Sequence, residues 1–409
     1  MHTDWPVRWP AEWRDARALD LVRGTPFGCL LIPNTDDFRD VIQRARDNGL
    51  TVADPKDPPP DVEVAKGEWP GIRAGQGGDA SSGPTGAPWI DSNGWLIRLT
   101  RIQKPNTQVW LQAEPPKPNE VKPVAQHMVA VADSAAHGGR WVITLDSGMA
   151  TALAAGKPEF VTQWKRLCRT AEFFRAHDDW RSWPVRANVG VVSSFSGDNE
   201  FFSKEVLNLT ARTNVSYRIF QKDELRPDAL QGLVAVIYPD SDAPSPELRK
   251  VLLEYVAGGG LLICGPKWGM APGAHSAEQE HPRYTILRFG KGRIARAQKD
   301  PDDPYQVAQD AQILVSHRHD LVRFFNGFAL GAYFTSSPDG KRALVHVVNY
   351  AGSANFDALT ARIAGRFSSA RLWTFEAQEP KALKTVAQKD ALEVHLPWIP
   401  VYGALELEI

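Results

Sequence analysis

The chain has 409 residues, 43% of them hydrophobic and 23% charged, a balance typical of a globular protein of about two to four domains. Its 47 basic and 48 acidic side chains give a formal net charge of -1, so the chain has no overall positive field to hold a nucleic acid. No apolar run approaches the roughly 20 residues that cross a bilayer, so we expect a soluble protein with no membrane partner, exported if a leader has been removed.

The three cysteines, Cys29, Cys168 and Cys264, are far apart in the chain and odd in number. This pattern favours neither a disulfide framework nor a cysteine-based metal site, and the sequence has no phosphate loop or dinucleotide fingerprint. Cys264 lacks the Gly-x-Cys-x-Gly turn of an activated nucleophile, so we interpret it as a core thiol. We therefore expect no cofactor and no metal.

Residues 1–182 alternate between short apolar runs and amphipathic segments. The runs predict strands at 28–32, 50–54, 94–101, 108–114 and 140–146, and the amphipathic segments predict helices at 38–49, 121–139 and 158–180. Residues 55–88 are rich in Pro, Gly, Asp and Ser, which predicts an irregular excursion. The β-α rhythm indicates an α/β layer architecture, either an open sheet or part of a (β/α) barrel.

The stretch "SWPVR" at 182–186 is typical of a joint between domains, and the alternation restarts after it. Four predicted strands with three interposed helices follow up to residue 283: strands at 188–195, 215–220, 234–240 and 261–266, and helices at 199–213, 225–233 and 245–260. This order predicts a doubly wound sheet of the flavodoxin type.

From residue 284 the pattern changes to short strands. Residues 284–298 predict a hairpin around Gly290-Lys291-Gly292, and a helical piece is predicted through 320–328. The short strands that follow, at regular spacing, predict a small antiparallel β-sandwich: 342–350, 356–365, 370–377, 382–398 and 401–409.

Two stretches of the second half resemble known domains. The stretch "LVAVIYPDSDAPSPELRKVLLEYVAGGGLLICGP" resembles the trimerisation domain of family 42 β-galactosidases, a flavodoxin-like or glutamine-amidotransferase-like domain that follows a catalytic (β/α) barrel. The stretches "ALVHVVNYAG" and "VHLPWIPVYGALELE" are similar to the β-sandwich that closes many bacterial glycoside hydrolases. The resemblance implies a glycoside hydrolase-like protein that self-associates as a homo-oligomer.

By this resemblance, the N-terminal part falls where a (β/α) barrel is expected. It has about 180 residues where a complete barrel needs roughly 250, and the family's glutamate pair has no matching positions. We therefore predict a shortened or degenerate (β/α) barrel (1–182), then a flavodoxin-like doubly wound domain (183–283) and a β-rich C-terminal domain with a small antiparallel β-sandwich (284–409).

Glu114 and Asp146 end two neighbouring predicted strands, "VWLQAE" and "RWVITLD". Ligands bind at the carboxyl ends of strands in (β/α) folds, and glycoside hydrolysis needs a pair of carboxylates, so these two acids are the catalytic candidates. Trp110 and Gln112 share one side of the strand with Glu114 by alternation and are candidates for substrate binding. The alternative is that each acid only caps the helix or turn that follows it.

The stretch "APWIDSNGW" places Trp89 and Trp95 beside Asp91 and Asn93. Indole rings stack on the apolar faces of sugars, and the Asp and Asn side chains, together with Arg98, could bond hydroxyls, so these residues are further substrate-binding candidates. The alternative is that the tryptophans pin the loop to the core and that the polar pair bonds its own turn.

The sequence thus favours a protein that binds an oligosaccharide or polysaccharide and hydrolyses a glycosidic bond with a carboxylate pair. The alternative is a carbohydrate-binding or assembly protein without catalysis, built on a degenerate barrel.

Overall fold

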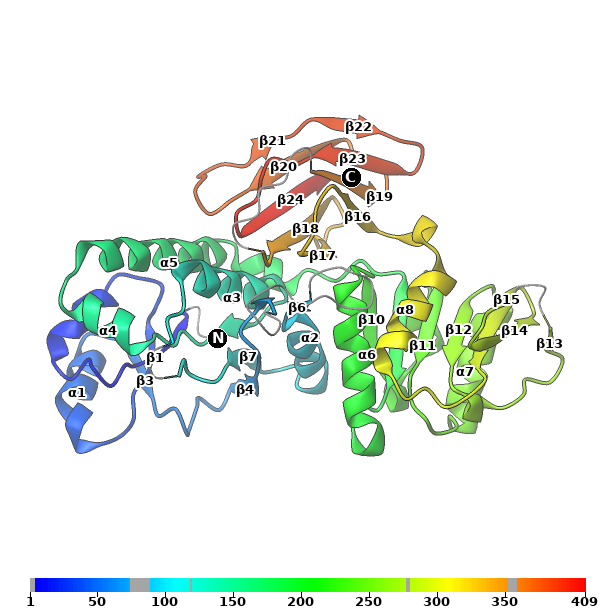
Figure 1. Ribbon diagram of the computed structural model, residues 1–409, viewed down its shortest axis with the longest axis horizontal. Helices are drawn as coiled ribbons and strands as arrows, with labels where there is room; N and C mark the ends of the chain where they lie inside the picture. Colours follow the sequence, from blue (N-terminus) through cyan, green and yellow to red (C-terminus); the bar gives the residue numbers. More distant parts are fainter. Residues whose placement is uncertain (1–3, 74–88, 118–119, 277–279, 352–358) are drawn as a thin grey trace.

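The structure, a computed structural model, describes residues 4–73, 89–117, 120–276, 280–351 and 359–409. It is a mixed α/β protein in which an N-terminal unit and a central unit lie side by side and a C-terminal β unit covers one side of their junction (Figure 1). Parts of two predicted segments, 74–88 and 356–358, lie outside the described residues. In the ranges that are described, no helix has both the length and the apolar character needed to span a membrane.

Six short parallel strands build the N-terminal unit: β1 (Pro6–Arg8), β2 (Cys29–Leu31), β3 (Thr51–Ala53), β4 (Val62–Lys66), β7 (Gln108–Gln112) and β8 (Arg140–Trp141). They form two three-stranded sheets, and a parallel bridge between Val7 and Ile143 joins β1 to the segment that continues β8. The resulting order is β3-β2-β1-β8-β7-β4, which is the order of a barrel. The described residues show no pairing between β3 and β4, so this barrel is not closed.

The two faces of these strands carry different cores. A small cluster of buried side chains lies on one face of the strands. Its members come from both sides of the unpaired edge between β3 and β4: Cys29, Leu31, Val62, Trp110 and Val142. Their neighbours in sequence point to the other face and pack against the helices, because side chains alternate along a strand. The interior of the incomplete barrel is therefore packed, with the fully buried Trp110 as its largest side chain.

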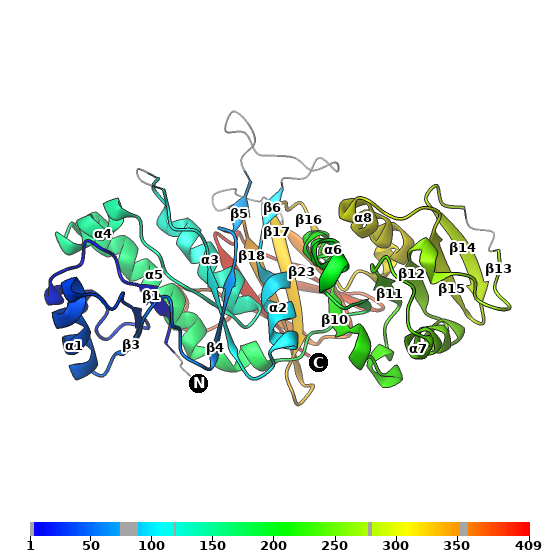
Figure 2. The same cartoon turned by 90° about the horizontal axis from the view of Figure 1, so that it is seen from below.

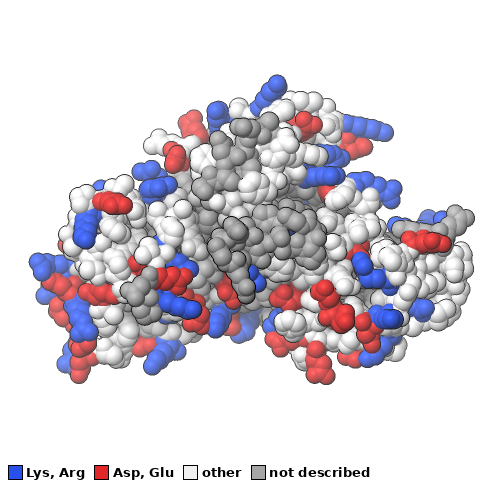
Figure 3. Space-filling model, in the orientation of Figure 1, with Lys and Arg blue, Asp and Glu red and all other residues white. Residues whose placement is uncertain are grey.

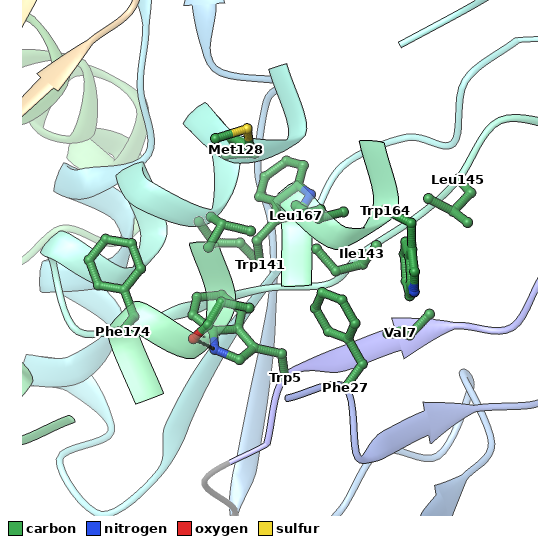
Figure 4. Packing of buried hydrophobic residues seen from close by; sticks show 14 of the residues in the cluster. Trp5, Val7, Phe27, Met128, Trp141, Ile143, Leu145, Trp164, Leu167 and Phe174 are labelled. Atoms are coloured by element: carbon green, nitrogen blue, oxygen red, sulfur yellow. Dashed lines mark hydrogen bonds between the residues drawn. The ribbon is translucent and has the colours of Figure 1, made fainter. Parts of the chain in front are cut away.

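The helices of this unit are α1 (Arg39–Asp47), α2 (Gly94–Gln103), α3 (Val124–Ala136), α4 (Ser147–Ala154) and α5 (Pro158–Ala176). The core that they cover is rich in tryptophan, and the Trp5 indole donates to the carbonyl of Ala171 on α5 at 3.1 Å (Figure 4). The buried tryptophans of the whole chain are Trp5, Trp9, Trp13, Trp110, Trp141, Trp164, Trp180, Trp183 and Trp268. Most of the abundant tryptophan is thus core material.

Two sequence predictions in this unit are wrong. Residues 94–101 form α2 instead of a strand, and β4 lies inside the segment 55–88 that was predicted to be irregular. The helix α2 was missed because it is wedged between two cores: Ile97 packs in the N-terminal core and Leu99 in the central one. Apolar residues on both sides hide the amphipathic period. Figure 2 shows α2 between β4 and α6.

A seven-stranded sheet forms the central unit, in the order β10-β9-β11-β12-β15-β14-β13. Its elements are β9 (Val189–Ser193), α6 (Glu200–Arg212), β10 (Tyr217–Gln221), β11 (Ala235–Tyr238), α7 (Pro246–Ala257), β12 (Leu261–Cys264), β13 (His275–Ser276), β14 (Tyr284–Phe289), β15 (Gly292–Ala297) and α8 (Pro304–Val315). The four strands predicted for a doubly wound sheet are all present and parallel. The predicted hairpin, β14 and β15, extends the same sheet because β15 pairs with β12.

Two antiparallel sheets form the C-terminal unit and share one core. Their orders are β16-β19-β23-β22 and β17-β18-β24-β20-β21. The strands are β16 (Val322–Phe325), β17 (Leu330–Ser336), β18 (Arg342–Asn349), β19 (Thr360–Ala364), β20 (Ser369–Trp373), β21 (Lys381–Ala382), β22 (Thr385–Ala387), β23 (Ala391–His395) and β24 (Tyr402–Glu408). The helix predicted through 320–328 is wrong: that stretch contains β16, and the helix, α8, precedes it.

A fully buried carboxylate, Asp133 on α3, joins the units. Its Oδ1 accepts a hydrogen bond from the Tyr350 hydroxyl at 2.6 Å, just past the end of β18. Its Oδ2 accepts from the backbone N–H of Asn93 at 2.9 Å and from the Asn93 side chain at 3.1 Å. Because a buried carboxylate is costly unless it is hydrogen-bonded, these contacts fix the loop before α2 and the C-terminal unit to the same helix.

The substitution Asp133→Ala is expected to lower the free energy of unfolding by about 2–5 kcal/mol, since it leaves buried donors on Tyr350 and Asn93 without an acceptor. Tyr350→Phe removes one donor and is expected to cost only about 0.5–1.5 kcal/mol. Urea unfolding of the purified variants measures both. Equal and small effects of the two substitutions would contradict the role of Asp133 as a joint.

Candidate functional site

The carboxyl ends of β4 and β7 bring charged side chains together. Lys66, the last residue of β4, pairs in register with Gln112, the last residue of β7. The Lys66 ammonium lies 2.6 Å from Oε1 of Glu114, and the Glu114 side chain is 75% exposed. The sequence-predicted acid therefore stands in solvent at the end of the barrel where ligands are expected.

Lys66 favours the ionised form of Glu114. The hydrogen bond and the charge of Lys66, with a smaller attraction from Arg8, lower the pKa of Glu114 below its ordinary value. The same contact raises the pKa of Lys66. Arg8, at the end of β1, has a pKa lowered by burial, which the charge of Glu114 partly opposes. Glu114 therefore stays ionised to a lower pH than an isolated glutamate.

Asp146 occupies a different environment from Glu114. It is buried, and its Oδ1 accepts from the backbone N–H of Met149 at 2.9 Å, which makes it the N-cap of α4. Its Oδ2 accepts from the backbone N–H of Lys122 at 3.3 Å. These bonds correspond to the capping role that the sequence left open as an alternative to catalysis.

Sequence analysis missed Glu68 and Trp69, which follow β4. Glu68 is exposed, and its charge adds to the rise in the pKa of Lys66. It lies two residues past the end of β4, just as Glu114 lies two residues past the end of the paired strand β7. The Trp69 indole donates to the carbonyl oxygen of Glu114 at 3.0 Å. The alternating tract "VEVAK" at 62–66 was the available signal, but the prolines and glycines around it hid the strand.

A buried histidine lies behind Trp69. The ring of His127, in the first turn of α3, packs edge to face on Trp69 at 5.1 Å between centroids. Burial lowers the pKa of His127 to about 4, and neither ring nitrogen has a hydrogen-bond partner among the described residues. His127 is therefore uncharged at neutral pH and supports Trp69.

Trp89 and Asp91 lie away from Glu114, against the central unit. The Arg212 guanidinium of α6 lies 4.0 Å from the centroid of the Trp89 ring, and Tyr305 of α8 stacks on that ring at 6.5 Å. Asp91 pairs with Arg73 at 2.6 Å and with Arg212 at 3.5 Å. Asp91 is in β6 (Ile90–Asp91), which pairs antiparallel with β5 (Gly71–Ile72), and Trp89 directly precedes β6.

Asn93 forms hydrogen bonds within the N-terminal unit, whereas Trp95 and Arg98 contact the central unit. The Asn93 side chain accepts from the Glu68 N–H at 2.8 Å and donates to the Glu68 carbonyl at 2.9 Å. Trp95 packs against the central core, and Arg98 donates to the carbonyl of Tyr217 and lies over its ring at 4.2 Å. Both line a cavity of about 40 Å³ at the junction of the three units. This volume is sufficient for one or two waters.

The remaining two candidates are placed by β7. Trp110 is fully buried in the interior of the open barrel, so it cannot contact a ligand at the exposed end. Gln112 is partly buried, and its carbonyl accepts from the Gly67 N–H at 3.1 Å. The structure therefore brings Gln112 and Glu114 to the barrel end and places Trp89, Asp91, Trp95 and Arg98 at the junction. Asn93 links the two regions through Glu68.

The described residues contain no group of three or more His, Cys, Asp or Glu side chains suited to hold a metal ion. No protein-family model matches the sequence. No curated protein matches it either.

Solved structures of glycosidases share the fold. α-L-Fucosidase isoenzyme 2 from Paenibacillus thiaminolyticus is similar with a TM-score of 0.53 and 11% identity, over 96% of this chain and 79% of the fucosidase. The rhamnosidase from Novosphingobium sp. PP1Y has a TM-score of 0.53 and 13% identity, over 91% of this chain and 38% of the rhamnosidase. A GH42 β-galactosidase from G. stearothermophilus has a TM-score of 0.49 and 10% identity, over 91% of this chain and 66% of that chain. The similarity to the fucosidase and the rhamnosidase shows that the chain has a glycoside hydrolase-like fold.

Removing the charge next to Glu114 is expected to raise its pKa. In Lys66→Met, the pKa of Glu114 should move up toward its ordinary value of 4.5. Because the folded pKa is lowered, the ion pair stabilises the fold above about pH 4.5, and this contribution is lost as the pH falls through the lowered pKa. Carboxyl ¹³C titration by NMR measures the shift. Lys104→Met, which breaks the matched pair with Glu63, should leave the Glu114 titration unchanged. An identical pKa in wild type and Lys66→Met would refute the assignment.

The buried imidazole predicts acid sensitivity. The pKa of His127 falls from 6.5 to about 4 on folding, so the unfolded chain takes up its proton first and stability declines as the pH drops from 6.5 toward 4. His127→Leu is expected to make the melting temperature less dependent on pH in that interval. Thermal unfolding at a series of pH values tests this, and an unchanged slope in the variant would contradict a buried neutral His127.

Proposed function

We propose that this protein acts on a carbohydrate at the carboxyl end of its incomplete barrel and hydrolyses a glycosidic bond there. The observation that carries the proposal is the arrangement of Glu114 and Glu68 around Lys66 at the ends of two paired parallel strands. Retaining glycosidases hold their two carboxyl groups roughly 5–5.5 Å apart, so the proposal requires this separation between Glu114 and Glu68.

In this proposal the two acids have different tasks. Glu114, ionised by Lys66, is the nucleophile or base, and Glu68 is the proton donor. Asp146, which the sequence suggested as the second catalytic acid, accepts hydrogen bonds from two backbone N–H groups. We therefore propose Glu68 in its place.

A second candidate function is carbohydrate binding without turnover. The specific observation that favours it is the missing pairing of β3 with β4 among the described residues, since it leaves fewer strand ends to supply catalytic groups than a complete barrel has. In this case Glu114 and Lys66 would bond sugar hydroxyls as a charged pair.

Turnover of a panel of aryl glycosides and oligosaccharides separates the two candidates. Glu114→Gln and Glu68→Gln are each expected to lower kcat by about 10²–10⁴-fold, the usual contribution of a catalytic acid or base. The matched control is Glu63→Gln, because Glu63 is on the same strand β4 and also pairs with a lysine at 2.6 Å, but lies away from the end. Binding of a saccharide without turnover in wild type would favour the second candidate, and equal turnover in all three variants would eliminate the site.

A further inference from the structure

A groove separate from the barrel end lies between the central and C-terminal units. It has a volume of about 350 Å³ and is lined by α6, α8, β16 and the turn before β17. This size is within the range of roughly 300–1,000 Å³ that is usual for small-molecule sites. Its aromatic lining consists of Trp89, Tyr305, Phe324 and Phe328.

Polar groups lie among these rings. Gln309 and Gln312, three residues apart on α8, line the groove with side chains that are only partly buried. Each amide offers two donors and an acceptor, and neither bonds a described residue. In the wall, the Trp89 indole N–H and Nη1 of Arg212 have no acceptor among the described residues. Both atoms are buried from solvent, so a ligand in the groove would contact the two glutamine amides rather than these donors.

The charged groups of the groove are largely paired within the protein. Arg212 pairs with Asp91 at 3.5 Å, and His317 lies 2.9 Å from Asp320. Arg323, at the rim, lies over the Phe325 ring at 5.3 Å. On the face shown in Figure 3, acidic and basic side chains are interspersed. The pairing of Arg212 and His317 and the aromatic lining favour a ligand with little net charge and apolar faces, and the two glutamine amides favour hydroxyl groups on that ligand.

We propose that this groove binds a neutral saccharide, with the aromatic side chains against sugar rings and the two glutamine amides on hydroxyls. The proposal rests on the carbohydrate part of the proposed function but not on hydrolysis. It gives Trp89 a role that does not depend on Glu114: the indole forms a wall of a second saccharide site, held in place by Arg212 and Tyr305. The site would hold a distant part of a long chain or a separate chain.

The test is calorimetric titration of the full chain with neutral fragments of β-1,4-glucan, α-1,4-glucan and β-1,4-galactan, and with a polygalacturonate fragment as the anionic probe. Phe328→Ala, which removes a 48% exposed ring from the groove, is expected to weaken binding of a neutral fragment about 5- to 10-fold. Gln309→Ala combined with Gln312→Ala is expected to weaken it by a similar factor. The matched control is Phe201→Ala, which removes a 74% exposed ring outside the groove and should leave binding unchanged.

The outcomes separate this inference from the proposed function. Groove binding that survives Glu114→Gln but is weakened by Phe328→Ala supports the second site, whether or not any glycoside is turned over. Turnover that depends on Glu114 with no effect of the groove variants on binding would overturn the second site and leave the proposed function standing. Binding of the anionic fragment alone, or equal affinity in Phe328→Ala and Phe201→Ala, would also overturn it.

Discussion

The buried carboxylate of Asp133 constrains the rest of the molecule, since a charge with no exposed surface must find hydrogen-bond donors inside the protein. Its donors come from Tyr350 in the C-terminal unit and from Asn93 in the loop before α2. Asn93 in turn holds both backbone polar groups of Glu68, just beyond β4. A polar network thus runs from the C-terminal unit to the barrel end where Lys66 meets Glu114.

The N-terminal strands, among which the described residues show no β3–β4 pairing, are packed on both faces. Trp110 and four smaller side chains fill the interior of the barrel, and a layer rich in tryptophan packs between the strands and the helices outside. The helix α2 adds contacts on both sides, with Ile97 in one core and Leu99 in another. Because Trp110 fills the interior, the proposed barrel site is confined to the carboxyl ends of the strands, where Glu114 and Glu68 lie.

Sequence patterns predicted the helices and strands whose hydrophobic residues follow one clear period. They missed α2, whose apolar residues pack against two cores. The strands of the central sheet were predictable because their apolar runs and the glycines after α7 are unambiguous, and Cys264 is the buried core thiol expected. The helix α2 was not, since it is buried on two sides. The position of Glu114 just past a strand end and the capping alternative for Asp146 were both predicted from the sequence, but the contacts of Lys66 and Glu68 depend on tertiary pairing that no local pattern encodes.

Amide hydrogen exchange at Asn93 and Glu68 tests the connection between the buried carboxylate and the barrel end most directly. The Asn93 N–H donates to Asp133 and the Glu68 N–H donates to the Asn93 side chain, so both should exchange slowly and at similar rates, near those of the amides of α3. Rapid exchange of these two amides, at the rates of exposed loop residues, while α3 stays protected, would contradict the account.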